Sequence, residues 1–173
     1  MPKIIQNARE QLLATAQKQI AERGYAATTI RSVARECGLA VGTVYNYFKS
    51  KDLLIASFMA ADWQNCIQKI AACPTEDTEP FFFCVYQEIS GFAARHHALF
   101  SDPAATKTFS SVFQERHRQL CGQLAALFLP LCQHANAEER DFLSRLIAES
   151  VLAFTLEGTP FPWLYAAMKK LIN

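Results

Sequence analysis

Apolar residues near the start of the chain recur at spacings of three and four, with polar residues between them. The repeating positions are Ile5, Ala8, Leu12, Ala16 and Ile20. This period is that of an amphipathic helix, and Gly24 is a suitable residue to end it. Two shorter helical patterns follow at residues 28–37 and 42–48, with a turn that contains Gly38 between them. Thr28 is the expected N-cap of the second helix, because its hydroxyl can accept a backbone hydrogen bond.

The rest of the chain has the same helical period, interrupted by segments rich in proline, glycine and polar residues. We expect helices at residues 51–72, 80–95, 97–100, 103–129, 137–157 and 161–172. Pro103 stands at the first position of its helix, where proline is favoured, and Pro74 and Gly158 follow helix ends. No segment alternates apolar and polar residues between hairpin turns. The pattern therefore predicts an all-α protein of about nine helices.

The charges are distributed unevenly, although the total charge of the 173 residues is only +1. Residues 1–55 contain eight basic and four acidic side chains, whereas residues 56–173 contain nine basic and twelve acidic ones. The first part is therefore basic, at +4, and the remainder is acidic, at −3. Such an asymmetry is typical of a segment that faces nucleic acid.

The two short helices at residues 28–37 and 42–48 fit a helix-turn-helix, in which a short turn, often with a glycine, joins two helices. The expected inward residues are Ile30, Val33, Leu39, Val44 and Phe48, and the expected outward ones are Thr43, Tyr45, Asn46 and Tyr47. The outward set combines polar and aromatic side chains, which suit a DNA groove better than solvent alone. A place in the core is the alternative for Tyr45 and Tyr47.

The sequence around these helices has a specific pattern. Residues 24–34 read Gly-Tyr-Ala-Ala-Thr-Thr-Ile-Arg-Ser-Val-Ala, and residues 37–54 read Cys-Gly-Leu-Ala-Val-Gly-Thr-Val-Tyr-Asn-Tyr-Phe-Lys-Ser-Lys-Asp-Leu-Leu. This string resembles the TetR/AcrR family of bacterial transcriptional regulators. The family often has Ser or Thr where this chain has Ala40, and a basic or polar residue where it has Val41. These departures predict weaker phosphate contact at the turn, or contact shifted to later lysines, and Val41 could instead contact a thymine methyl group.

The resemblance implies a helix-turn-helix DNA-binding domain at residues 1–50 and a helical effector-binding and dimerisation domain at residues 51–173. The residues that it assigns to DNA are Thr28, Thr29, Arg31, Gly42, Thr43, Tyr45, Asn46, Tyr47, Lys49 and Lys51. The threonines and lysines of the flanks are expected on phosphate, together with backbone amides of the second helix. Thr43 and Asn46 are expected at base edges, and the tyrosines on the DNA backbone or a thymine methyl group.

A helix-turn-helix this small reads few bases, so a homodimer is expected to place two recognition helices about 34 Å apart on double-stranded DNA. The resemblance implies that the last two long helices form the dimer interface. The residues assigned to it are Phe142, Leu146, Ser150, Ala153, Phe154, Phe161, Trp163, Leu164 and Met168. Packing within one chain is the alternative for each of them.

The resemblance further implies a pocket for a small-molecule effector among the fourth to seventh helices. Its expected lining is Trp63, Ile67, Phe82, Tyr86, Phe113 and His117. The aromatic and apolar character of this set favours a hydrophobic or aromatic ligand. Filling of the core is the alternative for each residue, and no cofactor is implied.

Six cysteines raise the question of disulfides and metal sites. The N-terminus has no secretory signal pattern and no run spans a membrane, so we expect a cytoplasmic, nucleoid-associated protein with reduced thiols. No Cys-x-x-Cys pair is present, and no metal ligand is assigned. His117 and Cys121 nevertheless share a helix face. An enzyme built on these two residues, or on His96, is disfavoured because no third, orienting group is recognisable.

The sequence therefore predicts a transcriptional regulator rather than an enzyme. The expected function is a ligand-responsive dimeric repressor, which binds a palindromic operator and is released by a hydrophobic or aromatic small molecule. The alternative is a metal-sensing or thiol-redox-sensing regulator that uses the same DNA-binding domain.

Overall fold

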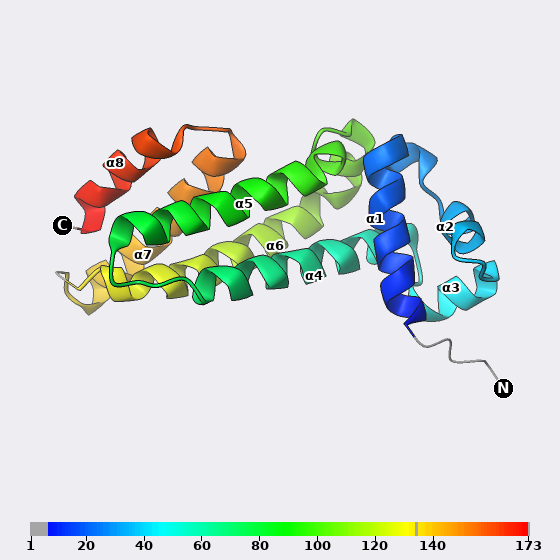
Figure 1. The fold of residues 1–173 in the computed structure, drawn as a ribbon, viewed down its shortest axis with the longest axis horizontal. Coiled ribbons are helices and arrows are strands. Elements are labelled where there is room, and N and C mark those ends of the chain that lie inside the picture. The colour runs from blue at the N-terminus through cyan, green and yellow to red at the C-terminus, as the bar shows by residue number, and fades with distance from the viewer. Residues whose placement is uncertain (1–6, 134, 173) are drawn as a thin grey trace. The chain divides into compact units, whose positions relative to one another are not determined.

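The computed structural model describes residues 7–133 and 135–172, with the side chains of 109–116 left aside. This part of the chain is helical throughout and contains no strand (Figure 1). Its elements are α1 (Ala8–Ala27), α2 (Ile30–Glu36), α3 (Val41–Tyr47), α4 (Lys51–Ala71), α5 (Thr78–Phe100), α6 (Pro103–Phe128), η1 (Leu129–Leu131), α7 (Ala137–Leu156) and α8 (Phe161–Ile172). The prediction of an all-α protein of about nine helices is confirmed for these residues.

The chain divides into two compact units. One, called the head unit here, comprises Met1–Trp63 and Arg95–Ser110, and the other, the body unit, comprises Gln64–Ala94 and Ser111–Asn173. Helices α4, α5 and α6 each contribute to both units. The expected division at residue 50 follows the helix-turn-helix pattern, whereas the compact head unit also includes the start of α4, the end of α5 and the start of α6.

Three local features differ from the helix pattern expected from the sequence. The helix α1 extends to Ala27, but Gly24 interrupts it where the sequence predicts its end, because the φ of 79° and ψ of 172° of this glycine are not helical. The N-cap of α2 is Thr29 rather than Thr28, and its Oγ1 accepts a hydrogen bond from the backbone N–H of Ser32. Residues 78–100 form one continuous helix instead of two, because no glycine or proline interrupts its last turns (Figure 1).

The head unit packs around apolar residues of α1, α2 and α4. Helix α1 contacts α2, and α2 contacts α3. The buried apolar side chains include Leu12, Ala16, Ile20, Ile30, Val33, Val44, Phe48, Leu54, Ile55 and Phe58. Of the residues expected to face inward, Ile30, Val33, Val44 and Phe48 are buried and Leu39 is half-buried, while Ile5 lies outside the described residues.

Aromatic side chains form much of the core of the body unit. Phe81 and Phe82 of α5 meet Phe128 of α6, with ring centroids 5.9 and 5.1 Å away. Phe161 of α8 stacks on Tyr165, with centroids 5.7 Å apart, and Phe82 is 5.8 Å from Tyr165. Helices α5, α6 and α8 are therefore joined mainly through ring contacts, each of which adds about 0.5–1.5 kcal/mol to the burial of apolar surface.

A disulfide joins Cys73, after the end of α4, to Cys84 of α5. This bond corrects the expectation that all six thiols are reduced. The pairing was not apparent in the sequence because the two residues come together only when the loop between α4 and α5 folds back. The other four cysteines are not disulfide-bonded. Among the helices described, none is both long and apolar enough to cross a bilayer.

Candidate nucleic-acid interface

The helices α2 and α3 form a helix-turn-helix whose turn depends on one glycine. Gly38 has a φ of 66°, in the left-handed region where side chains with a Cβ are strained. It follows the end of α2, and the next residue donates a backbone hydrogen bond of 2.8 Å from Leu39 N to Ala34 O. This arrangement ends α2 sharply, and four residues separate it from α3.

The outer face of α3 is exposed over three consecutive residues. Tyr45 is 45% exposed and Tyr47 is 37% exposed, and Asn46 between them is also exposed. Val44 and the C-cap residue Phe48 are buried and hold the helix against the head unit. The exposure of both tyrosines excludes the alternative in which they fill the core.

The position of α2 is fixed by a buried glutamine of α1. Gln19 is fully buried, and its amide group lies between two residues of α2. Its Nε2 donates to Glu36 Oε2 at 2.6 Å, and its Oε1 accepts from Ser32 Oγ, also at 2.6 Å. The bond from Gln19, followed by that from Lys18, lowers the pKa of Glu36. Both ends of the amide are thus satisfied, which makes its burial tolerable and its loss costly.

Several basic residues of the head unit are engaged within the protein. Lys18 and Arg23 each form an ion pair with Glu36, at 3.2 and 3.7 Å. The ammonium group of Lys51 lies 3.5 Å from the centre of the Tyr25 ring and donates to the Tyr25 carbonyl oxygen at 2.9 Å. Burial of Lys51 lowers its pKa. The positive charge of this unit is therefore only partly available for a partner.

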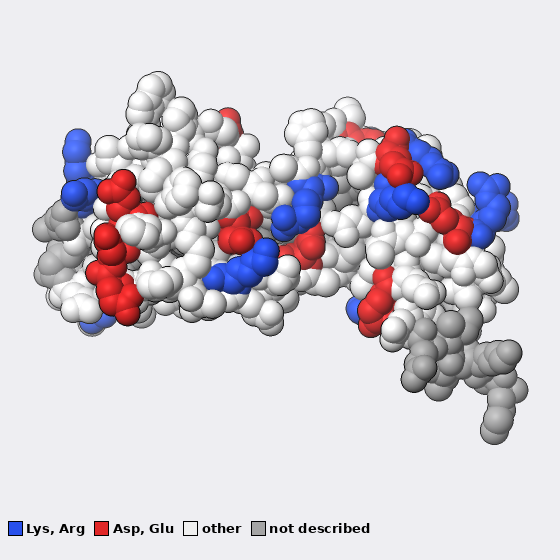
Figure 2. All heavy atoms as spheres, viewed as in Figure 1, with Lys and Arg blue, Asp and Glu red and all other residues white. Residues whose placement is uncertain are grey.

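Three basic side chains of the helix-turn-helix region remain exposed with no ion pair among the described residues. They are Arg31 and Arg35 of α2 and Lys49, which follows α3. Arg35 lies four residues after Arg31, so the two share a helix face. Arg35 is not among the residues assigned to DNA from the sequence, although its spacing from Arg31 is visible there. Figure 2 shows the charges of the head unit intermixed, with acidic side chains beside basic ones, on the face that it draws.

The structure places the ten expected DNA-binding residues in different environments. Thr29, Arg31, Gly42, Tyr45, Asn46, Tyr47 and Lys49 are exposed, and Thr43 is half-buried. Thr28 is buried, and its Oγ1 donates to the carbonyl oxygen of Gly24 at 2.9 Å. Thr28 and Lys51 thus both interact within the protein. Thr28 forms a hydrogen bond to the kinked end of α1, and Lys51 contacts the ring and the carbonyl oxygen of Tyr25.

The carboxylate of Asp62 in α4 interacts with three nitrogen atoms of side chains in the head unit. One oxygen of Asp62 accepts hydrogen bonds from Gln17 Nε2 at 3.2 Å and Arg95 Nε at 3.1 Å, and lies 2.9 Å from His96 Nε2. The His96 side chain is only 1% exposed, and its ring stacks on Phe58 with centroids 5.8 Å apart. Asp62 therefore links α1, α4 and the end of α5 inside the unit that carries the helix-turn-helix.

The described residues expected in an effector pocket lie in different environments. Trp63 and Phe82 are buried, Ile67 is half-buried, and the hydroxyl of the half-buried Tyr86 donates to the carbonyl oxygen of Thr159 at 3.0 Å. His117 is exposed, and the side chain of Phe113 lies outside the described residues. The sequence signal was composition, which does not distinguish a pocket lining from a packed core.

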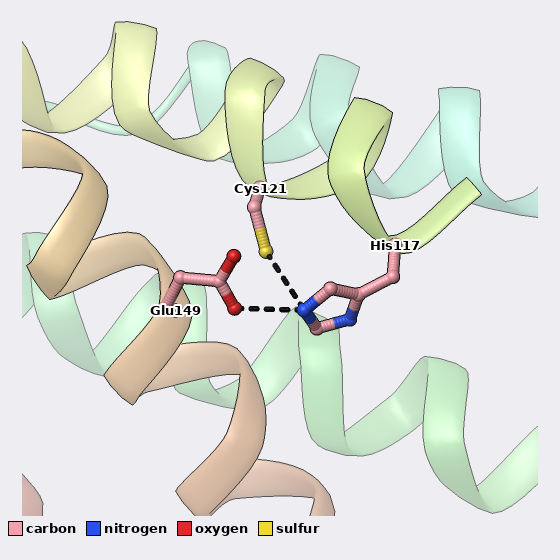
Figure 3. A group of neighbouring side chains, drawn as sticks. All are labelled: His117, Cys121 and Glu149. Carbon is pink, nitrogen blue, oxygen red and sulfur yellow. Dashed lines mark hydrogen bonds and ion pairs between the residues drawn. The ribbon is translucent and has the colours of Figure 1, made fainter. Parts of the chain in front are cut away.

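A groove does lie between α6 and α7. It has a volume of about 310 Å³, and its lining includes Arg118, Cys121, Ala125, Arg145 and Glu149. No described member of the expected effector set lines it. At the groove, His117 and Cys121 of α6 face Glu149 of α7 (Figure 3). Burial, with the nearby Glu149 carboxylate, raises the pKa of the Cys121 thiol to about 12.

The residues expected at a dimer interface separate into two groups. Phe142 is 65% exposed and Trp163 is 72% exposed, and Leu146, Ala153 and Phe154 are exposed as well. Ser150 and Phe161 are half-buried. In contrast, Leu164 and Met168 are buried within the chain, because they face the core side of the amphipathic helix α8. A surface on α7 and α8 is therefore formed without these two residues.

Comparison with known proteins agrees with the helix-turn-helix in the head unit. Residues 12–58 match the family described as bacterial regulatory proteins, tetR family. The HTH-type transcriptional regulator HbdR of Aromatoleum sp. is 41% identical over 51 residues, which are 30% of this chain and 22% of that protein. The HTH-type transcriptional repressor KstR2 of Mycobacterium tuberculosis is 28% identical over 127 residues, which are 66% of this chain and 62% of that protein. The chain thus spans less than two thirds of the length of these relatives.

The fold as a whole is also shared with solved structures. Salmonella enterica GusR matches with a TM-score of 0.72 at 14% identity, over 99% of this chain and 98% of that one. This likeness shows the fold of the chain, in which α2 and α3 form the helix-turn-helix. The match over residues 12–58 agrees with the family expected from the sequence, and the two relatives named above are transcriptional regulators, which agrees with the expectation of a regulator rather than an enzyme.

Proposed function

We propose that this protein is a homodimeric repressor that binds a palindromic operator and is released by a small-molecule effector. The observation that carries the proposal is the exposed row Tyr45, Asn46 and Tyr47 on α3, held by a buried Val44 and Phe48. A recognition helix must present such side chains to base edges while its other face anchors it to the protein. The names of relatives such as the repressor KstR2 favour repression over activation.

The proposed contacts with DNA fall into two groups. Thr43 and Asn46 read base edges, Asn46 by the paired donor and acceptor that suit adenine, while Gly42 allows close approach. Tyr45 and Tyr47 contact the sugar–phosphate backbone or thymine methyl groups. Thr29, Arg31 and Lys49 bind phosphate, because they are exposed and, for the two basic residues, have no competing carboxylate among the described residues.

The proposed dimer forms through the exposed apolar residues of α7 and α8. Phe142, Leu146, Phe154 and Trp163 are large apolar side chains that are between 37% and 72% exposed. A surface of this kind on a protein in water is commonly an interface. Dimerisation is also what a small helix-turn-helix needs, since two half-sites double the number of base contacts.

The proposed effector is a hydrophobic or aromatic molecule, as the residue composition of α4–α6 favours. It acts by binding more tightly to the form of the dimer that does not fit the operator, since only a difference in affinity can shift the equilibrium. A thermal-shift screen with hydrophobic and aromatic compounds tests this part: compounds that raise the melting temperature of the protein should also weaken operator binding.

The DNA-binding part is tested by fluorescence anisotropy with the DNA upstream of the gene and of its neighbours. We expect tight binding to one fragment with a two-fold symmetric site, and affinity that falls steeply as salt increases, because Lys and Arg release counterions from DNA. An absence of salt dependence, or equal affinity for every fragment, would contradict specific operator binding. Sedimentation at micromolar concentration tests the dimer independently of DNA.

A further inference from the structure

Three side chains of the body unit converge on one point between α6 and α7. His117 and Cys121 are four residues apart and therefore project from the same face of α6, while Glu149 approaches from α7 (Figure 3). The Nε2 atom of His117 lies 2.7 Å from Glu149 Oε2 and 3.5 Å from Cys121 Sγ. Each residue offers one atom that can bind a metal, and these atoms all lie within 4.8 Å of one another.

The arrangement differs from that of a catalytic cysteine with its histidine and carboxylate. In such a triad the nucleophile and the carboxylate bind opposite nitrogens of the ring, so that one holds the imidazole while the other exchanges a proton with it. Here Cys121 and Glu149 both approach the same nitrogen of His117. Three donor atoms directed at one point are the arrangement that a metal ion needs.

The distances are close to those of a tetrahedral site. With bonds of about 2.3 Å to sulfur and 2.0–2.1 Å to nitrogen or oxygen, tetrahedral angles separate sulfur from nitrogen by about 3.6 Å and nitrogen from oxygen by about 3.3 Å. The observed distance of 3.5 Å from Cys121 Sγ to His117 Nε2 agrees with the first value. The 2.7 Å between His117 and Glu149 must lengthen by about half an ångström, and both side chains are about half exposed and have room to move.

We propose that His117, Cys121 and Glu149 form a binding site for one divalent metal ion of the zinc class. The set of one thiolate, one imidazole and one carboxylate suits Zn²⁺ and Co²⁺, whereas Ca²⁺ and Mg²⁺ require oxygen ligands. Binding would deprotonate the thiol, because a metal ion stabilises the thiolate far more than water does. Three protein ligands leave the fourth position to a water molecule or a small ligand, as in sites that exchange ligands.

The site connects α6 to α7, the helix that carries part of the proposed dimer surface. The carboxylate of Glu149 belongs to α7, where Leu146 and Ala153 are part of the proposed dimer surface, and the other two ligands belong to α6. A bound ion would therefore cross-link α6 to α7. Any effect of the ion on operator affinity rests on the proposed function, whereas binding of the ion itself does not.

The site is tested with the full-length protein, freed of metal by a chelator and titrated with Co²⁺. We expect one Co²⁺ per chain, with a sulfur-to-cobalt charge-transfer band in the near ultraviolet and the intense visible bands of a tetrahedral ion. Zn²⁺ should displace Co²⁺ and remove these bands. A wild-type protein without the charge-transfer band, or with only the weak spectrum of six-coordinate cobalt, would overturn the proposal.

Variants identify the ligands. Cys121→Ser should remove the charge-transfer band, whereas Cys37→Ser, which removes a more accessible thiol in the head unit, should keep it. Glu149→Gln and His117→Gln, at two exposed positions, should weaken Zn²⁺ binding at least about tenfold in competition with a chromophoric chelator. These two variants keep the test valid if Cys121→Ser does not fold. A band that survives Cys121→Ser, or unchanged affinity in both exposed variants, would place the metal elsewhere.

Discussion

The imidazole of His96 and the carboxylate of Asp62 lie 2.9 Å apart inside the head unit, where the His96 side chain is almost completely buried. Burial lowers the pKa of His96, while the charge of Asp62 and its hydrogen bond partly oppose that effect. The ring is therefore mainly neutral at pH 7, and its Nε2–H donates a hydrogen bond to the carboxylate. This pair holds the end of α5 against α4 in the unit that carries the helix-turn-helix.

The stability of the protein should decrease in mild acid because of His96. The unfolded chain takes up a proton near pH 6.5, whereas the folded chain takes it up only at lower pH, since the folded pKa is lowered. Between these two values the unfolded state binds more protons, so the free energy of unfolding falls as pH falls. The slope for one proton is at most about 1.4 kcal/mol per pH unit.

Urea unfolding of the wild type and of His96→Gln at pH 7.5, 6.5 and 5.5 measures this contribution. The variant should lose part of the decrease in stability that the wild type shows between pH 6.5 and 5.5. His97→Gln, which changes the adjacent exposed histidine, is the matched control and should keep the wild-type slope. Equal slopes for wild type and His96→Gln would show that this ring does not cause the decrease.

Removal of the Asp62 carboxylate should destabilise the head unit. Asp62→Ala removes the acceptor that Gln17, Arg95 and His96 share. Of these three partners, His96 is buried. We expect a loss of about 1–3 kcal/mol in the free energy of unfolding, because a buried donor loses its acceptor. Asp141→Ala removes an exposed partner of Arg145 and should change stability by less than about 0.5 kcal/mol. A similar loss in both variants would mean that the Asp62 bonds contribute no more than a surface ion pair.

Replacement of Gln19 should weaken the packing of α2 on α1 and so destabilise the protein. Gln19→Ala leaves Glu36 Oε2 and Ser32 Oγ without the partner that each has in the buried amide. The expected cost is about 1–3 kcal/mol of unfolding free energy. Gln11→Ala, at an exposed position of the same helix, is the control. Denaturant midpoints that coincide for the two variants would rule out a structural role for the amide.

Two substitutions in the helix-turn-helix should weaken DNA binding in different ways. Asn46→Ala should cost about 1–3 kcal/mol at the operator and little on unrelated DNA, since it removes the side chain proposed to contact a base. Arg31→Ala should weaken binding to all sequences and reduce the salt slope by about 1, since it removes the side chain proposed to contact phosphate. Lys169→Ala, which removes an exposed charge of α8, should leave both unchanged. Anisotropy titrations at several salt concentrations distinguish these outcomes, and identical behaviour of Asn46→Ala and Arg31→Ala would contradict the division of roles.

A charge placed on the exposed surface of α7 and α8 should dissociate the proposed dimer. Trp163→Glu changes the most exposed large apolar residue of that surface, at 72%. We expect a monomer in sedimentation velocity with unchanged helix content by circular dichroism, because the side chain contributes little to the core of its own chain. Leu53→Glu, at a position 53% exposed in the head unit, should leave the dimer intact. A Trp163→Glu dimer with wild-type affinity would exclude this residue from the interface.

The sequence predicted most helix positions and the helix-turn-helix correctly, because both depend on local patterns. It did not predict the N-cap of α2, since Thr28 and Thr29 both carry a hydroxyl and only the backbone path decides which one accepts the bond from Ser32. It divided α5 at two adjacent histidines, although His96 continues the buried face of the helix. The expected effector lining depended on composition and stays a prediction, since the burial of Trp63 and Phe82 fits either a pocket wall or a packed core.

The sequence by itself determined the class of protein, because the period of apolar residues and the motif from Gly24 to Leu54 are properties of neighbouring positions. Only the tertiary structure decided which charges have a partner within the protein, since Glu36 of α2 forms ion pairs with Lys18 and Arg23 of α1. The tertiary structure also pairs Cys73 with Cys84 in a disulfide and places Glu149 beside His117 and Cys121. These relationships are distances between residues far apart in the chain, and such distances are set by the packing of helices.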